Sequence, residues 1–184
     1  MILFSSIITP RLQYIAGFVG KELTGQNIQL TADADAYNAY HGVRINYSNE
    51  RICSDECWLK PHTLLFEEHI REESITCFEI NGRKAFFRTE GDFPFDIFAA
   101  SFYLLSRYEE YLPHQKDAYG RYDHQNSLAY REGFLDQPLV NYWINDFRKI
   151  IEVKFPSFSR YHSSFTFLPT YDIDMAWSYK HKGR

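Results

Sequence analysis

The chain has 184 residues, of which 45% are hydrophobic and 18% aromatic, and its formal net charge is −4. This apolar content excludes a disordered chain, and the weak negative charge excludes a basic field that would recruit nucleic acid or an anionic membrane. No apolar run approaches the ~20 residues of a membrane helix, and the length favours one main domain.

The first thirty residues predict a β-α-β unit. Residues 2–6 are typical of a strand, and Pro10 opens an amphipathic helix that Gly25 ends. Residues 27–31 then return as a second strand. Because the crossover in such a unit is right-handed, the two strands are expected to be parallel.

The next segment is less regular. A short helix is expected over residues 32–40, and the alternating residues 43–47 predict a third strand. Over residues 49–72, Pro61 and the many charged residues break any regular period, so no element is predicted there.

Three cysteines, Cys53, Cys57 and Cys77, cannot all pair within one chain. We expect free thiols and therefore a reducing, cytoplasmic location. Cys53 and Cys57 are spaced as metal ligands that His62 could join, but a single Cys-x₃-Cys favours buried free thiols instead.

A hairpin is predicted over residues 76–80 and 84–88. The intervening Asn81-Gly82 suits the type I′ turn that joins two alternating runs. Because a hairpin adds antiparallel pairing, the sequence predicts an α/β fold with a mixed sheet of at least five strands and helices on its faces.

Two long helices are predicted in the second half. One covers residues 94–112, with Asp92 just ahead of it and Pro113 after it, and is apolar around most of its circumference. The other covers residues 137–154, with Asp136 as its N-cap.

Residues 113–135 form a long loop between these helices, and a loop of that length in a compact domain often carries function. Its polar cluster consists of Arg121, Asp123, His124 and Glu132. The first three are candidate pocket residues, although such a cluster is more often structural. Just ahead of the loop, Arg107 with Glu109 and Glu110 predicts an ion-paired surface turn.

The strand-like residues 165–168 lead to Asp172-Ile173-Asp174. Residues two apart in a strand point to the same side, so both carboxylates would share one face. Such a pair suits a divalent metal, or one acid that binds metal beside another that acts as a base. The alternative is a strand end with two solvated acids.

Four segments resemble a family of bacterial polysaccharide deacetylase-like proteins. They are residues 92–111, Gly120-Arg121-Tyr122, Ser127-Leu128-Ala129 and residues 133–138. In that family, an N-terminal domain of unknown function precedes a deacetylase domain of the NodB-homology type. The resemblance implies an accessory domain over residues 1–163 and the first strand of a truncated deacetylase domain over 164–184.

The resemblance also implies residue roles. Asp172 corresponds to the general base of the deacetylase and Asp174 to a ligand of its divalent metal, often zinc. The family's His-x₃-His is absent, because no two of the seven histidines are four residues apart. This chain alone is therefore expected to lack a metal and activity. Its expected partners are the C-terminal deacetylase domain of the same polypeptide and possibly carbohydrate.

Two other functions fit the residues. A nucleotide-sugar transferase could use Asp172-x-Asp174 to chelate a metal held by a diphosphate. A carbohydrate-binding or scaffolding module without chemistry would instead expose an aromatic groove, for which the candidates are Tyr119, Tyr122, Tyr130 and Trp177.

Overall fold

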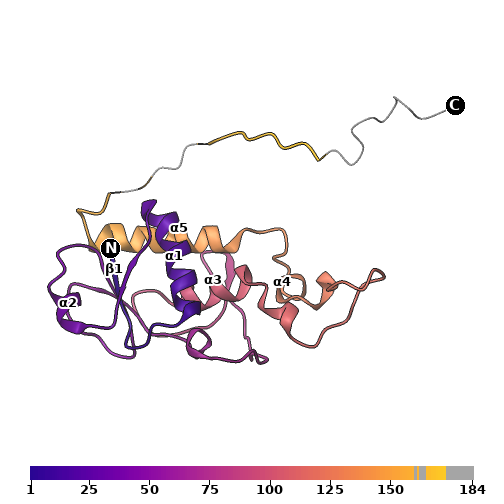
Figure 1. The fold of residues 1–184 in the computed structure, drawn as a ribbon, viewed down its shortest axis with the longest axis horizontal. Helices are drawn as coiled ribbons and strands as arrows, with labels where there is room; N and C mark the ends of the chain where they lie inside the picture. The colour runs from indigo at the N-terminus through magenta and orange to yellow at the C-terminus, as the bar shows by residue number, and fades with distance from the viewer. Residues whose placement is uncertain (160, 162–164, 173–184) are drawn as a thin grey trace.

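Four parallel strands form the central sheet of the structure, a computed structural model that describes residues 1–159, 161 and 165–172. The strands are β1 (Ile2–Phe4), β2 (Gln29–Thr31), β3 (Arg44–Tyr47) and β4 (Cys57–Leu59). They lie in the order β2-β1-β3-β4. Figure 1 shows β1 beside the N-terminus. The predicted α/β class and β-α-β opening are confirmed.

Helices surround this sheet. The α-helices are α1 (Pro10–Thr24), α2 (Ala34–Asn38), α3 (Ile97–Leu105), α4 (Leu128–Arg131) and α5 (Leu139–Lys154). The 3₁₀ turns are η1 (Thr63–Phe66), η2 (Tyr108–Tyr111) and η3 (His124–Asn126). Helices α1, α3 and α5 pack against one another, whereas α2 packs against β1 and β2. One continuous apolar core therefore joins the two halves of the chain.

The predicted hairpin is present as β5 (Phe78–Ile80) and β6 (Arg83–Ala85), which form a separate two-stranded sheet. Asn81 has a φ of 50° and Gly82 a φ of 72°, as a type I′ turn requires. The antiparallel pairing of the hairpin stays outside the main sheet, and Phe87, just after β6, adopts a left-handed φ of 58°. Only an isolated antiparallel bridge, Leu59 to Gly91, touches the β4 edge in the described part of the chain.

The helix predicted over residues 94–112 is shorter and is broken. Asp96 is its N-cap, and Arg107 adopts a left-handed φ of 53° that separates α3 from η2. The prediction that Asp92 lies at the start of this helix was wrong. Its carboxylate instead accepts a hydrogen bond of 2.7 Å from the Trp58 N–H and pairs with Arg51 and Lys154.

The start of α5 also differs from the prediction. The helix begins at Leu139, and Pro138 occupies the N-cap position without a side-chain hydrogen bond, so Asp136 is not the cap. The described structure adds β4, which no sequence pattern predicted. A three-residue strand carries almost no periodicity, and β4 exists because it pairs with β3.

A buried carboxylate connects the two halves of the core. Asp96 is fully buried and accepts hydrogen bonds from the Tyr47 hydroxyl on β3 at 2.6 Å, the His62 N–H at 2.7 Å and the Ala99 N–H at 2.9 Å. Burial raises the pKa of this carboxyl to about 6, although its hydrogen bonds act in the opposite direction. Asp96 is therefore both a helix cap and a link between the sheet, η1 and α3.

The topological switch point of the main sheet is covered by η1. In this strand order the direction of winding reverses between β1 and β3, where open α/β sheets usually bind ligands at the carboxyl ends of strands. There, Thr9 caps α1 and donates to the Leu65 carbonyl at 2.5 Å, while Arg11 donates to the Leu64 carbonyl at 2.7 Å. These hydrogen bonds hold η1 over the start of α1 and cover this edge of the sheet.

Candidate functional site

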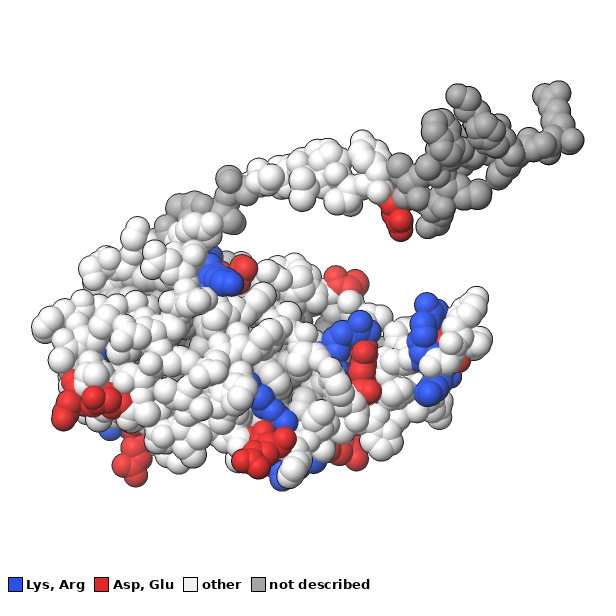
Figure 2. All heavy atoms as spheres, viewed as in Figure 1, with Lys and Arg blue, Asp and Glu red and all other residues white. Residues whose placement is uncertain are grey.

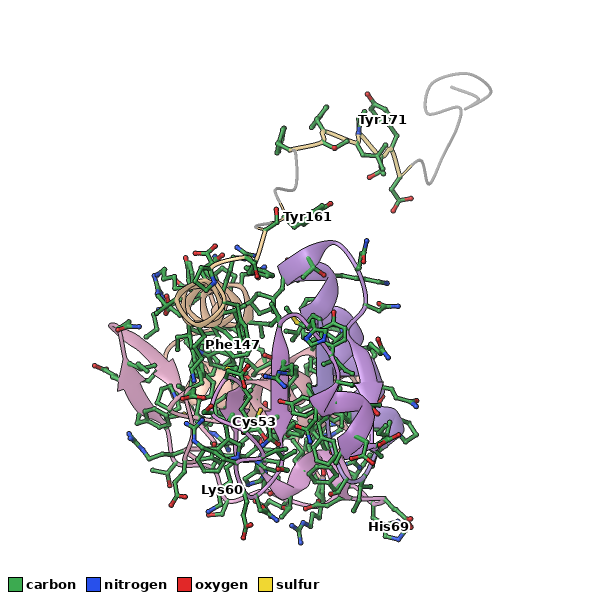
Figure 3. All side chains as sticks on the ribbon, turned by 90° about the vertical axis from the view of Figure 1, so that its left-hand side faces the viewer. Cys53, Lys60, His69, Phe147, Tyr161 and Tyr171 are labelled. Atoms are coloured by element: carbon green, nitrogen blue, oxygen red, sulfur yellow. The ribbon has the colours of Figure 1, made fainter. Side chains whose placement is uncertain are left out.

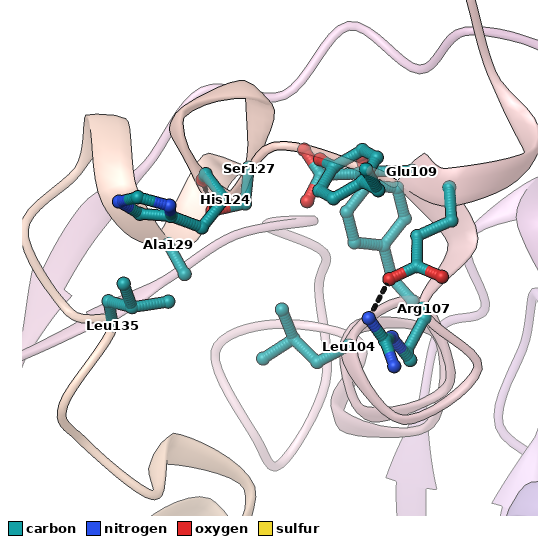
Figure 4. A pocket seen from close by; sticks show the side chains of 10 residues that line it. Leu104, Arg107, Glu109, His124, Ser127, Ala129 and Leu135 are labelled. Carbon is teal, nitrogen blue, oxygen red and sulfur yellow. Dashed lines mark hydrogen bonds and ion pairs between the residues drawn. The ribbon is translucent and has the colours of Figure 1, made fainter. Parts of the chain in front are cut away.

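A pocket of about 280 Å³ opens between the end of α3, η2 and the segment that carries η3 and α4 (Figure 4). It is lined by Tyr103, Leu104, Arg107, Glu109, Glu110, Tyr122, His124, Ser127, Ala129 and Leu135. The predicted loop over residues 113–135 is thus partly structured. Its η3 and α4 fold back onto the end of α3 because the buried Leu128 and Phe134 join the core.

Glu109 is half-buried in this pocket. Its Oε1 accepts a hydrogen bond of 2.8 Å from the Leu128 N–H and lies 3.7 Å from the Arg131 guanidinium. The hydroxyl of the buried Tyr103 also donates to this carboxylate. Burial raises the pKa of Glu109 above its ordinary value, and these hydrogen bonds partly offset that effect. Glu109 is therefore an acceptor that is held in place and only partly hydrated.

Tyr122 lies beside Glu109 with a hydroxyl that is buried and has no hydrogen-bond partner. Burial, followed by the nearby Glu109 charge, raises the pKa of this phenol to about 12, so it keeps its proton at neutral pH. Its ring meets the His114 imidazole edge-on, with the ring centres 5.0 Å apart. Tyr122 is therefore a lining residue of the pocket whose hydroxyl is buried and unsatisfied.

The other side of the pocket is apolar. Leu104 from α3, Ala129 from α4 and Leu135 face the same gap from different directions (Figure 4). Leu135 is 54% exposed, although leucine is usually buried. The pocket consequently combines an apolar wall with polar groups on the opposite side, which is the usual composition of a small-molecule site.

The rim carries paired charges. The Arg107 guanidinium forms an ion pair with Glu110, as the sequence predicted for this helix end. His124 has its Nδ1 3.2 Å from the Asp123 carboxylate, and its ring packs edge-on against Tyr130 at 5.1 Å. These pairs leave the mouth of the pocket without a strong charge of either sign.

The three candidate pocket residues from the loop line one hollow. Arg121, Asp123 and His124 surround a second space of about 460 Å³, which shares Arg107 and Tyr122 with the pocket. Arg121 is held through its backbone and side chain by Asp117, with Nε 3.1 Å from the carboxylate. Only His124 of the three also lines the pocket itself.

Sequence reasoning missed the inner polar residues. Glu109 was expected in an ion-paired surface turn with Arg107, an expectation that holds for Glu110 but not for Glu109. The available signal was a pair of acids placed directly after an apolar helix. Which of the two turns inward depends on the left-handed Arg107, and that conformation has no sequence signature here.

The predicted catalytic residue, Asp172, does not line this pocket. Asp172 is exposed, on the extended residues 165–172, and Figure 3 shows the neighbouring Tyr171 well away from the body that contains Phe147. Asp174 falls outside the described residues. No group of three or more histidines, cysteines, aspartates or glutamates in the part of the chain that the structure describes could hold a metal ion.

The other sequence-based candidates are also placed. Cys53, Cys57 and Cys77 are free thiols, and Cys57 is buried in β4. Three of the four candidates for an aromatic groove lie within the described residues. Tyr119 is 82% exposed, Tyr130 is 48% exposed and Tyr122 is half-buried. The fourth, Trp177, lies outside the described residues. These three rings therefore form no continuous exposed groove, since Tyr122 turns into the pocket.

Within the described residues, no helix has the length and apolarity needed to span a membrane. Acidic and basic side chains are interspersed on the face shown in Figure 2.

Comparison with other proteins places the chain in a family. No curated protein and no solved structure matches the chain. Residues 1–156 match a family described as "Family of unknown function (DUF7033)", and the chain therefore belongs to this family.

Proposed function

We propose that this chain contains a noncatalytic accessory domain of a metal-dependent carbohydrate deacetylase. The domain would pack against a C-terminal deacetylase domain of the same polypeptide and present acetylated sugar to it. The sequence resemblance over residues 92–138 supports this assignment.

One observation carries the proposal. Residues 165–172 are extended, and four of their large apolar side chains are exposed: Phe165 at 92%, Phe167 at 77%, Leu168 at 78% and Tyr171 at 83%. A run this apolar is costly to leave in water, at about 25 cal/mol per Å². It has the pattern of a strand that becomes buried in a second domain.

The catalytic roles are part of the same proposal. In the longer polypeptide, Asp172 would act as general base and Asp174 would bind the metal. A catalytic zinc needs about three protein ligands, and the described residues do not provide them. The described part of the chain therefore does not fit such a metal by itself, and its role is structural or substrate-binding. The three free thiols agree with a reducing compartment, and we place the protein in the cytoplasm.

The size of the native polypeptide tests this proposal. An antibody raised against the chain should detect a band far above 21.9 kDa in source cells, because a β/α barrel adds on the order of 200 residues. Immunoblotting of a fresh lysate, with protease inhibitors present, gives the answer. A single band at 21.9 kDa would contradict the proposal, since no second domain would exist to bury residues 165–171.

A further inference from the structure

The Tyr122 hydroxyl is buried and has no hydrogen-bond partner. More than about 90% of buried polar groups in proteins have a hydrogen-bond partner, so an unpartnered one calls for an explanation. Of the described residues with an unpartnered buried atom, Tyr122 is the one that lines the pocket at the end of α3. A ligand that enters this pocket would supply the missing partner.

Glu109 and the apolar wall restrict what that ligand is. Glu109 and Tyr122 line the same pocket, and the charge of Glu109 raises the pKa of the Tyr122 phenol. A carboxylate offers about four lone-pair sites, and two are used by the Leu128 N–H and the Tyr103 hydroxyl, while the Arg131 guanidinium lies 3.7 Å away as an ion pair. The pocket therefore combines one unpartnered hydroxyl donor with remaining acceptor capacity on the Glu109 carboxylate, opposite an apolar wall.

The charges favour a neutral ligand. Arg107 is paired with Glu110 at the rim, and Glu109 has Arg131 beside it. A charged ligand would have to displace one of these partners and lose its own hydration. The volume of about 280 Å³ lies just below the 300–1,000 Å³ range typical of drug-sized ligands, which suits one small unit.

We infer that the pocket binds the acetamido group of an N-acetylated sugar unit. The Tyr122 hydroxyl donates to the acetamido carbonyl oxygen, and the amide N–H donates to the Glu109 carboxylate. The methyl group contacts the wall formed by Leu104, Ala129 and Leu135. The choice of an acetylated sugar rests on the proposed function, whereas the donor, acceptor and apolar wall come from the pocket itself.

Calorimetric titration of the whole chain tests the inference. We expect tetra-N-acetylchitotetraose to bind, and cellotetraose, which has hydroxyls in place of the acetamido groups, to bind at least tenfold more weakly. Tyr122→Phe removes the hydroxyl and keeps the ring, so it should weaken binding of the acetylated tetramer by roughly three- to tenfold. Tyr119→Phe, a matched change outside the pocket, should leave the affinity unchanged.

A second variant guards against misfolding. Leu135→Ala changes an exposed side chain of the apolar wall, and it should also weaken binding without altering the thermal midpoint. The inference is overturned if the acetylated tetramer does not bind, if cellotetraose binds equally well, or if Tyr122→Phe has no effect. The titration measures binding and not catalysis, so its result is independent of the test of the proposed function. A large native polypeptide combined with any of these results would defeat the inference and leave the proposed function standing.

Discussion

Asp96→Ala is expected to destabilise the fold by about 3 kcal/mol. The substitution removes the N-cap of α3, which is worth about 1 kcal/mol. It also leaves the Tyr47 hydroxyl and the His62 N–H without an acceptor in the core, at about 1–3 kcal/mol each. Because the variant no longer has to bury a carboxylate, part of this loss in folding free energy is recovered. Urea unfolding followed by circular dichroism measures the difference.

The effect of Asp96→Ala should depend on pH. Because the pKa of this carboxyl is about 6 in the folded chain and 3.8 ordinarily, the folded chain retains a proton between pH 4 and 6 that the unfolded chain has lost. The contribution of Asp96 to stability is thus full below pH 4 and declines as the pH rises through 6. The variant should therefore lose more stability at pH 4 than at pH 7.

Asp33→Ala is the matched control for Asp96→Ala. Asp33 is also an aspartate N-cap, on α2, but it is exposed and its side chain accepts only from the Asp35 and Ala36 N–H groups. Its loss should cost at most about 1 kcal/mol. If both alanine variants lost the same stability, Asp96 would be a cap and nothing more.

Gly20→Ala should destabilise the fold by about 2 kcal/mol or more. Gly20 is buried in α1, and a Cβ there would lie 2.6 Å from the Ile28 nitrogen and 2.7 Å from the Gln26 carbonyl oxygen. Both neighbours are backbone atoms, so α1 would have to move away from the turn that leads to β2. That cost exceeds the roughly 1 kcal/mol by which alanine favours a helix over glycine.

Gly17→Ala provides the comparison in the same helix. A Cβ at Gly17 would meet only the Asn27 side-chain oxygen, at an ordinary distance of 3.6 Å. Here the helix preference of alanine acts without a clash, so we expect a gain of about 0.5 kcal/mol. Thermal or urea unfolding of both variants decides the matter. A Gly20→Ala variant as stable as the wild type would show that α1 and the turn before β2 are not in such close contact.

Local signals accounted for the parts of the fold that the sequence predicted. Pro10 and Gly25 mark the ends of α1, and Asn81-Gly82 marks the hairpin turn. These residues fix backbone angles by themselves and need no distant partner. For this reason the β-α-β opening and the hairpin were both predictable.

Tertiary contacts decided the parts that were missed. Asp92 and Asp96 are both plausible caps in the sequence, but Asp92 is held by the Trp58 N–H, and this leaves Asp96 as the cap. The break at Arg107 and the strand β4 also depend on neighbours far away in the chain. No local pattern contains that information.

The candidate site also contains residues that the sequence could identify and residues that only tertiary contacts reveal. His124 could be selected from the sequence because it stands in a long polar loop. Glu109 and Tyr122 acquire their interest only through burial, which brings a carboxylate and an unpartnered hydroxyl into one pocket. The roles of Asp172 and Asp174 remain predictions from resemblance, to be tested in the native polypeptide.

Acetate release by the native polypeptide is the most direct test of this account. The protein is purified from source cells with the antibody and incubated with tetra-N-acetylchitotetraose, and free acetate is measured enzymatically. We expect acetate release that falls by about 10²–10⁴-fold in an Asp172→Asn variant, because this substitution removes the proposed general base. No acetate release from the wild-type polypeptide, or undiminished release by Asp172→Asn, would contradict it.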